Sequence, residues 1–270
     1  MTRGEIDTLL ALLESSEAEP ILRAVAGLRL ALADLQEASL RSVLEAICGL
    51  FYIDLYDRPD LQQAVDEAEE TIASAGERAV PILIHLMEGS DAKSHLHLAR
   101  VLGRIGLAAL PRLREMIATS EEPYGRAFAL YAVGKIESDE VHVALPETVG
   151  ALMHPDKEVR DSAARTLGKI VERVPAGRLT ERRRAEIYES LMRTTADLQA
   201  AVRAKAIRSL GKMARHAYLA PEQMRRLRER LRAMLTRDET SDWDRAYIVR
   251  REAQEALRHL EVNSPPGGGL

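Results

Sequence analysis

The stretch from Asp156 to Ile170 most constrains the fold of this chain, because its pattern recurs along the sequence. Apolar residues follow one another in it at intervals of four, four and three positions, as one face of an α-helix requires. Those residues are Val159, Ala163, Leu167 and Ile170. Glycine inside a helix costs about 1 kcal/mol relative to alanine. Gly168, near the end of the stretch, therefore predicts close packing against another helix.

Further copies of this pattern align on Gly168 in both directions. Three clear copies have a glycine at the same position: Asp91–Ile105 (Gly103), Pro123–Ile136 (Gly134) and Ala201–Met213 (Gly211). Three weaker copies have another residue there: Leu22–Ala33 (Ala31), Ala64–Ala75 (Ala73) and Val249–Leu260 (Arg258). The aligned positions are 42, 30, 31, 34, 43 and 47 residues apart. A period of this size indicates a helical solenoid.

A second helix is predicted before each copy. Three of these helices open with an apolar residue and proline, which the first turn of a helix tolerates: Ala79–Met87, Ala109–Ile117 and Ala144–Leu152. Asp91 and Asp156 lie where N-caps are expected. The sequence thus predicts an all-α, right-handed α-solenoid of about seven antiparallel helix pairs. The pairs span about 4–35, 37–76, 77–106, 107–137, 141–174, 181–216 and 220–262, as one domain over 1–262 with a disordered tail at 263–270.

The form Val-Arg-x-x-Ala-Ala-x-x-Leu-Gly-x-Ile, together with the Pro-led partner helices, resembles HEAT repeats. It is most similar to the short kind known as phycobilisome-lyase HEAT-like repeats. The resemblance is strong from Ala79 to Met213 and weaker over the rest of the chain. It implies that first helices line a convex side and second helices a concave side. Adaptors, lyases, hydroxylases and DNA-repair enzymes share the fold, so it implies no single function.

Composition and charge narrow the class of protein. The N-terminus lacks the pattern of a signal peptide, and no apolar run approaches the roughly 18 residues of a membrane span. The single cysteine, Cys48, excludes an internal disulfide and is predicted to be a buried small hydrophobe. We therefore expect a soluble, cytoplasmic protein without a membrane partner.

The charge is distributed unevenly along the chain. Residues 1–150 hold 13 Lys+Arg and 25 Asp+Glu, a net charge of −12, whereas residues 151–270 hold 25 and 17, a net charge of +8. Such polarity can steer a partner or favour head-to-tail self-association. The alternative is that the charge of the exposed helix surfaces varies along the chain without serving a function.

No motif for chemistry stands out. None of the seven histidines is followed by Glu, as the ligands of the HEAT-repeat iron enzyme deoxyhypusine hydroxylase would be. His95 and His97 are two positions apart on a helix and should point to different sides. There is no Gly-x-Ser-x-Gly elbow and no phosphate-binding glycine loop. Trp243, beside two aspartates, is predicted to anchor the last two helices. We expect no catalytic residue, metal or cofactor, and no enzyme activity.

A column of cations provides the candidate site. The residue after the aligned glycine is basic in four consecutive repeats, and the residue four positions earlier shares its helix face. The eight residues are Arg100, Arg104, Tyr131, Lys135, Arg165, Lys169, Arg208 and Lys212. They lie opposite the apolar stripe, so we expect them to be exposed as a basic strip along the concave groove, roughly 30 Å long. Favourable interaction with helix C-termini is the alternative explanation for these cations.

A second column occupies another position of the repeat. It contains Arg126, Arg160, Arg203 and Arg250. We predict that these arginines are structural and pair with carboxylates or carbonyls of neighbouring repeats.

These observations favour a non-enzymatic scaffold or adaptor that binds an acidic segment of a partner protein in the groove. One alternative is nucleic-acid binding by the basic C-terminal half, which would weaken steeply with salt. Another is a bilin-lyase-like enzyme subunit.

Overall fold

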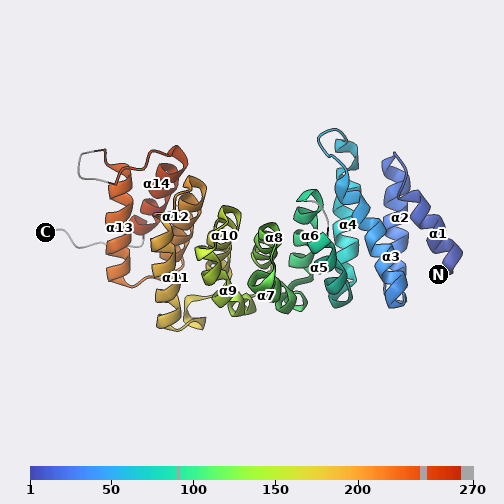
Figure 1. Ribbon diagram of the computed structural model, residues 1–270, viewed down its shortest axis with the longest axis horizontal. Helices are drawn as coiled ribbons and strands as arrows, with labels where there is room; N and C mark the ends of the chain where they lie inside the picture. The colour runs from blue at the N-terminus through green and yellow to red at the C-terminus, as the bar shows by residue number, and fades with distance from the viewer. Residues whose placement is uncertain (90–91, 238–241, 263–270) are drawn as a thin grey trace. The chain divides into compact units, whose positions relative to one another are not determined.

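Residues 1–89, 92–237 and 242–262 are described by a computed structural model, and within these ranges the chain forms α-helices and 3₁₀ helices but no strand (Figure 1). The α-helices are α1 (Arg3–Leu12), α2 (Ala18–Ala31), α3 (Glu37–Cys48), α4 (Gln62–Ser74), α5 (Val80–Gly89), α6 (Ala92–Ile105), α7 (Leu110–Thr119), α8 (Pro123–Val133), α9 (Leu145–Gly150), α10 (Lys157–Arg173), α11 (Glu181–Thr194), α12 (Ala200–Arg215), α13 (Pro221–Leu235) and α14 (Tyr247–Val262). Short 3₁₀ helices are η1 (Gly49–Tyr52), η2 (Pro59–Leu61), η3 (Gly76–Ala79), η4 (Gly106–Ala108), η5 (Asp139–Ala144), η6 (Ala151–Met153) and η7 (Ala176–Arg178).

Each odd-numbered α-helix packs against the even-numbered α-helix that follows it. The predicted all-α solenoid architecture is confirmed. Asp156 is the N-cap of α10, as predicted, and accepts hydrogen bonds from the backbone N–H groups of Glu158 (2.8 Å) and Val159 (3.4 Å). The other predicted N-cap, Asp91, and the predicted disordered tail at 263–270 lie outside the described residues.

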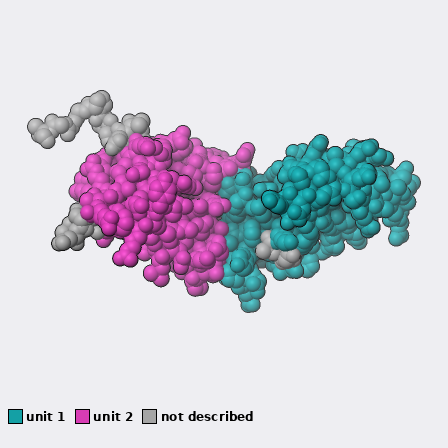
Figure 2. All heavy atoms as spheres, turned by 90° about the horizontal axis from the view of Figure 1, so that it is seen from above, with its two compact units in different colours: residues 1–136 teal, residues 137–270 magenta. Residues whose placement is uncertain are grey.

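The chain divides into two compact units, Met1–Ile136 and Glu137–Leu270 (Figure 2). Unit 1 contains α1 to α8, and unit 2 contains α9 to α14. The division falls between two predicted helix pairs. The prediction of one continuous domain over residues 1–262 stays a prediction.

Within each unit, each second helix packs against the second helix of the next repeat. In unit 1, α4 lies between α2 and α6, and α6 also packs on α8; in unit 2, α12 lies between α10 and α14. The aligned glycines permit this approach. A Cβ atom on Gly103 would overlap the Cβ atom of Lys135, which lies in the turn that follows α8. A Cβ atom on Gly168 would likewise overlap the Ser209 hydroxyl oxygen of α12. The close packing predicted from Gly168 is confirmed.

The arginine column stabilises the turns between first and second helices. Arg160 donates through Nε to Asp197 Oδ2 (2.7 Å) and through Nη1 to the carbonyl oxygens of His154 (2.9 Å) and Pro155 (2.7 Å). Arg203 repeats this arrangement one repeat later, and Arg250 and Arg126 also donate to backbone carbonyls of the turn before them. The predicted pairing with a neighbouring repeat is confirmed for Arg160 and Arg203. The hydrogen bonds of Arg126 and Arg250 are instead to carbonyl oxygens of their own repeat.

Two further predictions from the sequence concern single side chains. Cys48 is buried, as predicted, and burial raises the pKa of its thiol to about 12, so the reactive thiolate is suppressed. Trp243 lies in the turn between α13 and α14, where the guanidinium groups of Arg237 and Arg250 are 5.1 and 4.8 Å from its ring centroid. This position agrees with the anchoring role predicted for it.

No helix of the described ranges has the length and apolarity to cross a membrane.

Candidate partner-binding face

The eight residues of the predicted basic strip all lie on second helices or at their C-terminal ends, but they belong to different units. Arg100, Arg104, Tyr131 and Lys135 are in unit 1, and Arg165, Lys169, Arg208 and Lys212 are in unit 2. The strip across four repeats therefore stays a prediction, whereas the two groups can be examined separately.

In unit 1, the cations converge on a buried carboxylate that the sequence pattern did not reveal. Glu69 of α4 has a side chain only 1% exposed. His97 Nδ1 donates to its Oε1 at 2.8 Å, and guanidinium nitrogens of Arg100 and Arg104 lie 3.4 and 3.2 Å from its oxygens. Burial alone would raise the pKa of Glu69, but the hydrogen bond from His97 and the two arginine charges outweigh it and hold the pKa below its ordinary value.

The group continues onto α8 and the residues that follow it. Arg100 forms a hydrogen bond with Tyr131, and the Lys135 ammonium lies 5.3 Å from the centroid of the Tyr131 ring. Lys135 and Arg104 are exposed, whereas Arg100 and Tyr131 are half-buried. The expectation of exposure thus holds for only two of these four residues. Arg100 is half-buried beside Glu69, and Tyr131 is half-buried beside Arg100 and Lys135.

In unit 2, carboxylates are shared between neighbouring second helices. Glu172 of α10 pairs with Lys169 on its own helix (2.9 Å) and with Lys212 of α12 (3.1 Å). Arg208 of α12 donates to both carboxylate oxygens of Glu252 on α14, at 2.8 and 2.6 Å. These pairs hold the pKa values of Glu172 and Glu252 below the ordinary value, against the effect of burial. Lys212 is consequently only 18% exposed, in contrast to the predicted exposure.

Sequence alignment of the repeats also missed Lys205 of α12. Burial lowers its pKa, the nearby charge of Asp161 opposes this effect, and the charges of Arg165 and Arg208 add to it. Arg165 itself lies 3.7 Å from Asp161. Lys205 is two positions after the column arginine Arg203, where the other repeats have no lysine, so the repeat pattern gave no signal for it.

Taken as a set, the second-helix face of unit 2 carries more cations than carboxylates. Six cations and three carboxylates are linked by ion pairs or charge interactions: Arg165, Lys169, Lys205, Arg208, Lys212 and Arg251 with Asp161, Glu172 and Glu252. We call these nine residues the α10–α12–α14 cluster. Its excess positive charge favours an anionic ligand. In unit 1, the corresponding face has Glu69 and Glu70 close to its arginines and is more nearly neutral.

Because the Glu69 carboxylate is buried and ion-paired, we expect the folded protein to lose stability at acidic pH. Because the folded-state pKa of Glu69 is lowered, its contribution is present above the unfolded-state pKa of about 4.3 and is lost as pH falls through the folded-state value. We expect Glu69→Gln to lower the free energy of unfolding by about 2 kcal/mol at pH 7. The difference from wild type should shrink below about pH 4. Urea unfolding at several pH values measures this, and a difference that does not change with pH would contradict it.

His95 and His97, two positions apart on α6, have different aromatic neighbours. His97 stacks on Phe51 (ring centroids 4.9 Å apart), whereas His95 meets the ring of Phe128 edge-on at 5.2 Å. The two histidines therefore point to different surroundings, as predicted. Within the described ranges, no group of three or more His, Cys, Asp or Glu side chains is placed to hold a metal ion.

Comparisons with known proteins agree with this architecture. The family model of the HEAT repeat matches residues 144–174, which include α9 and α10. The Kap95:Nup1 complex contains a similar chain, with a TM-score of 0.64 and 14% identity, over 97% of this chain and 36% of that one. An engineered protein solved by the Northeast Structural Genomics Consortium is also similar, with a TM-score of 0.54 and 18% identity over 97% and 98% of the two chains.

A third similar structure is the complex of CpcE and CpcF of phycocyanin lyase from Nostoc sp. PCC7120. Its TM-score is 0.53 at 21% identity, covering 66% of this chain and 98% of that one. At such identities, the similarity shows the fold alone. Among curated proteins, none has a sequence that matches this chain. The chain is an all-α solenoid, and its residues 144–174 match the HEAT repeat.

Proposed function

We propose that the protein is a non-enzymatic scaffold that binds an acidic segment of a partner protein through the second helices of its repeats. The observation that carries this proposal is the excess of six cations over three carboxylates in the α10–α12–α14 cluster. The structure of Kap95 in complex with Nup1 and that of CpcE with CpcF support a protein partner for a chain of this fold.

The internal ion pairs leave room for such a ligand. Arg165, Lys169 and Arg208 each keep more than 40% of their side chains exposed, although each has a carboxylate nearby. A carboxylate of the partner would reduce the mutual repulsion of the clustered cations. It would also interact with Lys205, whose charge is disfavoured by burial and by Arg165 and Arg208. The cluster would thus act as a preformed acceptor for negative charge.

The test replaces exposed cations of the face while keeping the pairs that stabilise the fold. The variant Arg165→Gln, Lys169→Gln, Arg251→Gln leaves Glu172 paired with Lys212 and Glu252 paired with Arg208. The probe is a fluorescein-labelled glutamate-rich peptide, and its binding is followed by fluorescence anisotropy at low salt. At about 0.5 kcal/mol for each exposed contact, we expect the affinity of the triple variant to fall about tenfold.

The matched control removes the same charge from first helices. Arg182, Arg225 and Arg232 are exposed on α11 and α13, and their replacement by Gln should change the affinity by less than about threefold. Equal losses in the two variants would show attraction to net charge alone and would refute the proposed face. A random-sequence DNA duplex that binds more tightly than the peptide would favour the nucleic-acid alternative.

A further inference from the structure

Helix α1 is amphipathic, but its apolar stripe is only partly covered by the rest of unit 1. None of its residues is buried, although Ile6, Leu9 and Leu10 lie towards the neighbouring helices. Two clefts border the helix, one of about 770 Å³ and the other of about 740 Å³. An apolar stripe flanked by open volume on both sides is incompletely packed.

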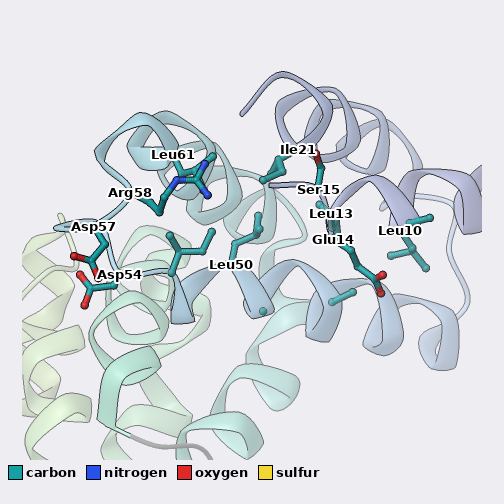
Figure 3. A pocket seen from close by; sticks show the side chains of 14 residues that line it. Leu10, Leu13, Glu14, Ser15, Ile21, Leu50, Asp54, Asp57, Arg58 and Leu61 are labelled. Atoms are coloured by element: carbon teal, nitrogen blue, oxygen red, sulfur yellow. The ribbon is translucent and has the colours of Figure 1, made fainter. Parts of the chain in front are cut away.

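The larger cleft lies between first helices, and the packing of the repeats explains why it is open. Helices α2 and α4 pack closely along their length, whereas α1 and α3 make few contacts with one another. The segment from Ile53 to Leu61, which connects η1 to α4, closes one end of the space. The floor and walls are apolar, with Leu10, Leu13, Ile21, Leu50 and Leu61 turned towards the cleft (Figure 3).

The rim of this cleft is negatively charged. Glu14 lies on one side, and Asp54 and Asp57 lie on the other (Figure 3). The one cation of the lining, Arg58, is bound to Asp60 at 2.7 and 3.0 Å and to the carbonyl oxygen of Ser16. Its charge is therefore already compensated. Within the described ranges, no ion pair joins Glu14 or Asp57 to a cation.

The surrounding unit has the same sign of charge. Residues 1–136 hold 13 Lys+Arg and 21 Asp+Glu, a net charge of −8. The field around the cleft therefore attracts cations, and the Glu14 and Asp57 carboxylates can pair with them on arrival. A ligand of this cleft must therefore carry positive charge, whereas a ligand of the α10–α12–α14 cluster must carry negative charge.

We propose that the cleft between α1 and α3 docks an amphipathic helix of a partner protein whose apolar residues are flanked by lysine or arginine. The apolar side chains of the ligand would occupy the space above Leu50 and Leu61, as in other helix-in-groove complexes, where anchors recur every three or four residues. Lysines or arginines on either side of them would pair with Glu14 and with Asp54 and Asp57. Apolar burial would provide the affinity, and the rim would select the charge of the ligand.

The test uses the full chain and two fluorescein-labelled probe peptides of about 14 residues, or about four helical turns. The first contains Leu on one helix face and Lys on the other, and the second has Glu in place of Lys. We expect the Lys peptide to bind this cleft, whereas any binding of the Glu peptide should occur at the α10–α12–α14 cluster and should not change when the cleft is filled. Ala46, exposed on α3 and part of the lining, allows the cleft to be filled. Ala46→Trp should lower the affinity for the Lys peptide about tenfold or more.

A charge variant tests the rim independently of the filling variant. Glu14→Lys with Asp57→Lys changes two exposed side chains and should also reduce affinity for the Lys peptide about tenfold, most strongly at low salt. The control Glu77→Lys with Glu121→Lys makes the same charge change at exposed positions of unit 1 away from the cleft. It should alter affinity by less than about threefold. Circular dichroism confirms the fold of each variant.

Three outcomes would overturn the proposal. The first is a Lys peptide that does not bind the wild-type chain. The second is an equal loss of affinity in the rim and control variants, which would indicate attraction to the acidic unit as a whole. The third is self-association of the chain that Ala46→Trp abolishes, which would identify a second copy as the occupant. The Arg165, Lys169 and Arg251 variant should leave binding of the Lys peptide unchanged, so this experiment is distinguishable from that on the α10–α12–α14 cluster.

Discussion

Gly103→Ala is expected to lower the free energy of unfolding by about 2–3 kcal/mol, although alanine is the better helix former. A Cβ atom at this position would overlap the Cβ atom of Lys135 and would lie 3.2 Å from the carbonyl oxygen of Ala132. Neither atom belongs to the mobile end of a side chain. Helices α6 and α8 would have to move apart, and the buried contacts between them would be lost. Urea unfolding followed by circular dichroism measures the change.

The control is a glycine of the same unit that has space around it. Gly49 follows α3 with a backbone angle φ of −55°, and a Cβ atom there would meet no other atom within 4 Å. Gly49→Ala should therefore be neutral or should stabilise the protein by about 0.5–1 kcal/mol, through the restricted unfolded chain. If the two alanine variants were equally stable, the close approach of neighbouring helices would not explain why this repeat position is glycine.

The glycine shows what the sequence could predict. Its recurrence at intervals of 31, 34 and 43 residues, with apolar residues at fixed offsets, is a consequence of one packing arrangement used repeatedly. The same register identified the arginine column and placed the eight strip residues on second helices. Local periodicity is sufficient for these features, because each repeat contacts its neighbours in a similar way.

The carboxylates that pair with the strip residues could not be predicted from the spacing of the repeats. Glu69 lies in one of the weaker repeat copies. It comes 28 residues before His97 and 31 residues before Arg100, and both of these side chains pair with its carboxylate. Glu252 pairs with Arg208 across 44 residues. These contacts depend on the rotation and separation of adjacent helices, which a single sequence pattern does not specify. The cleft beside α1 was missed for a related reason, since it results from the divergence of first helices.

Arg203→Met is the second substitution for which we expect a large effect, a loss of about 3–5 kcal/mol. Arg203 donates to both oxygens of Asp244, at 2.6 and 2.9 Å, and to the carbonyl oxygens of Asp197 (2.8 Å) and Leu198 (3.2 Å). The Asp244 side chain is only 8% exposed. Methionine would fill much of the volume but would leave this carboxylate without its cation and the turn carbonyls without their donor.

Arg225→Met is a matched control, because its ion pair has the same length in a different environment. Arg225 lies 2.6 Å from Glu222, as Arg203 lies 2.6 Å from Asp244, but the Arg225 and Glu222 side chains are 61% and 62% exposed. Water can replace the guanidinium there, so we expect little or no loss of stability. Similar losses for the two variants would mean that the column arginines act only as surface charges. A large difference would show that the buried carboxylate and the turn carbonyls make Arg203 a structural part of its repeat.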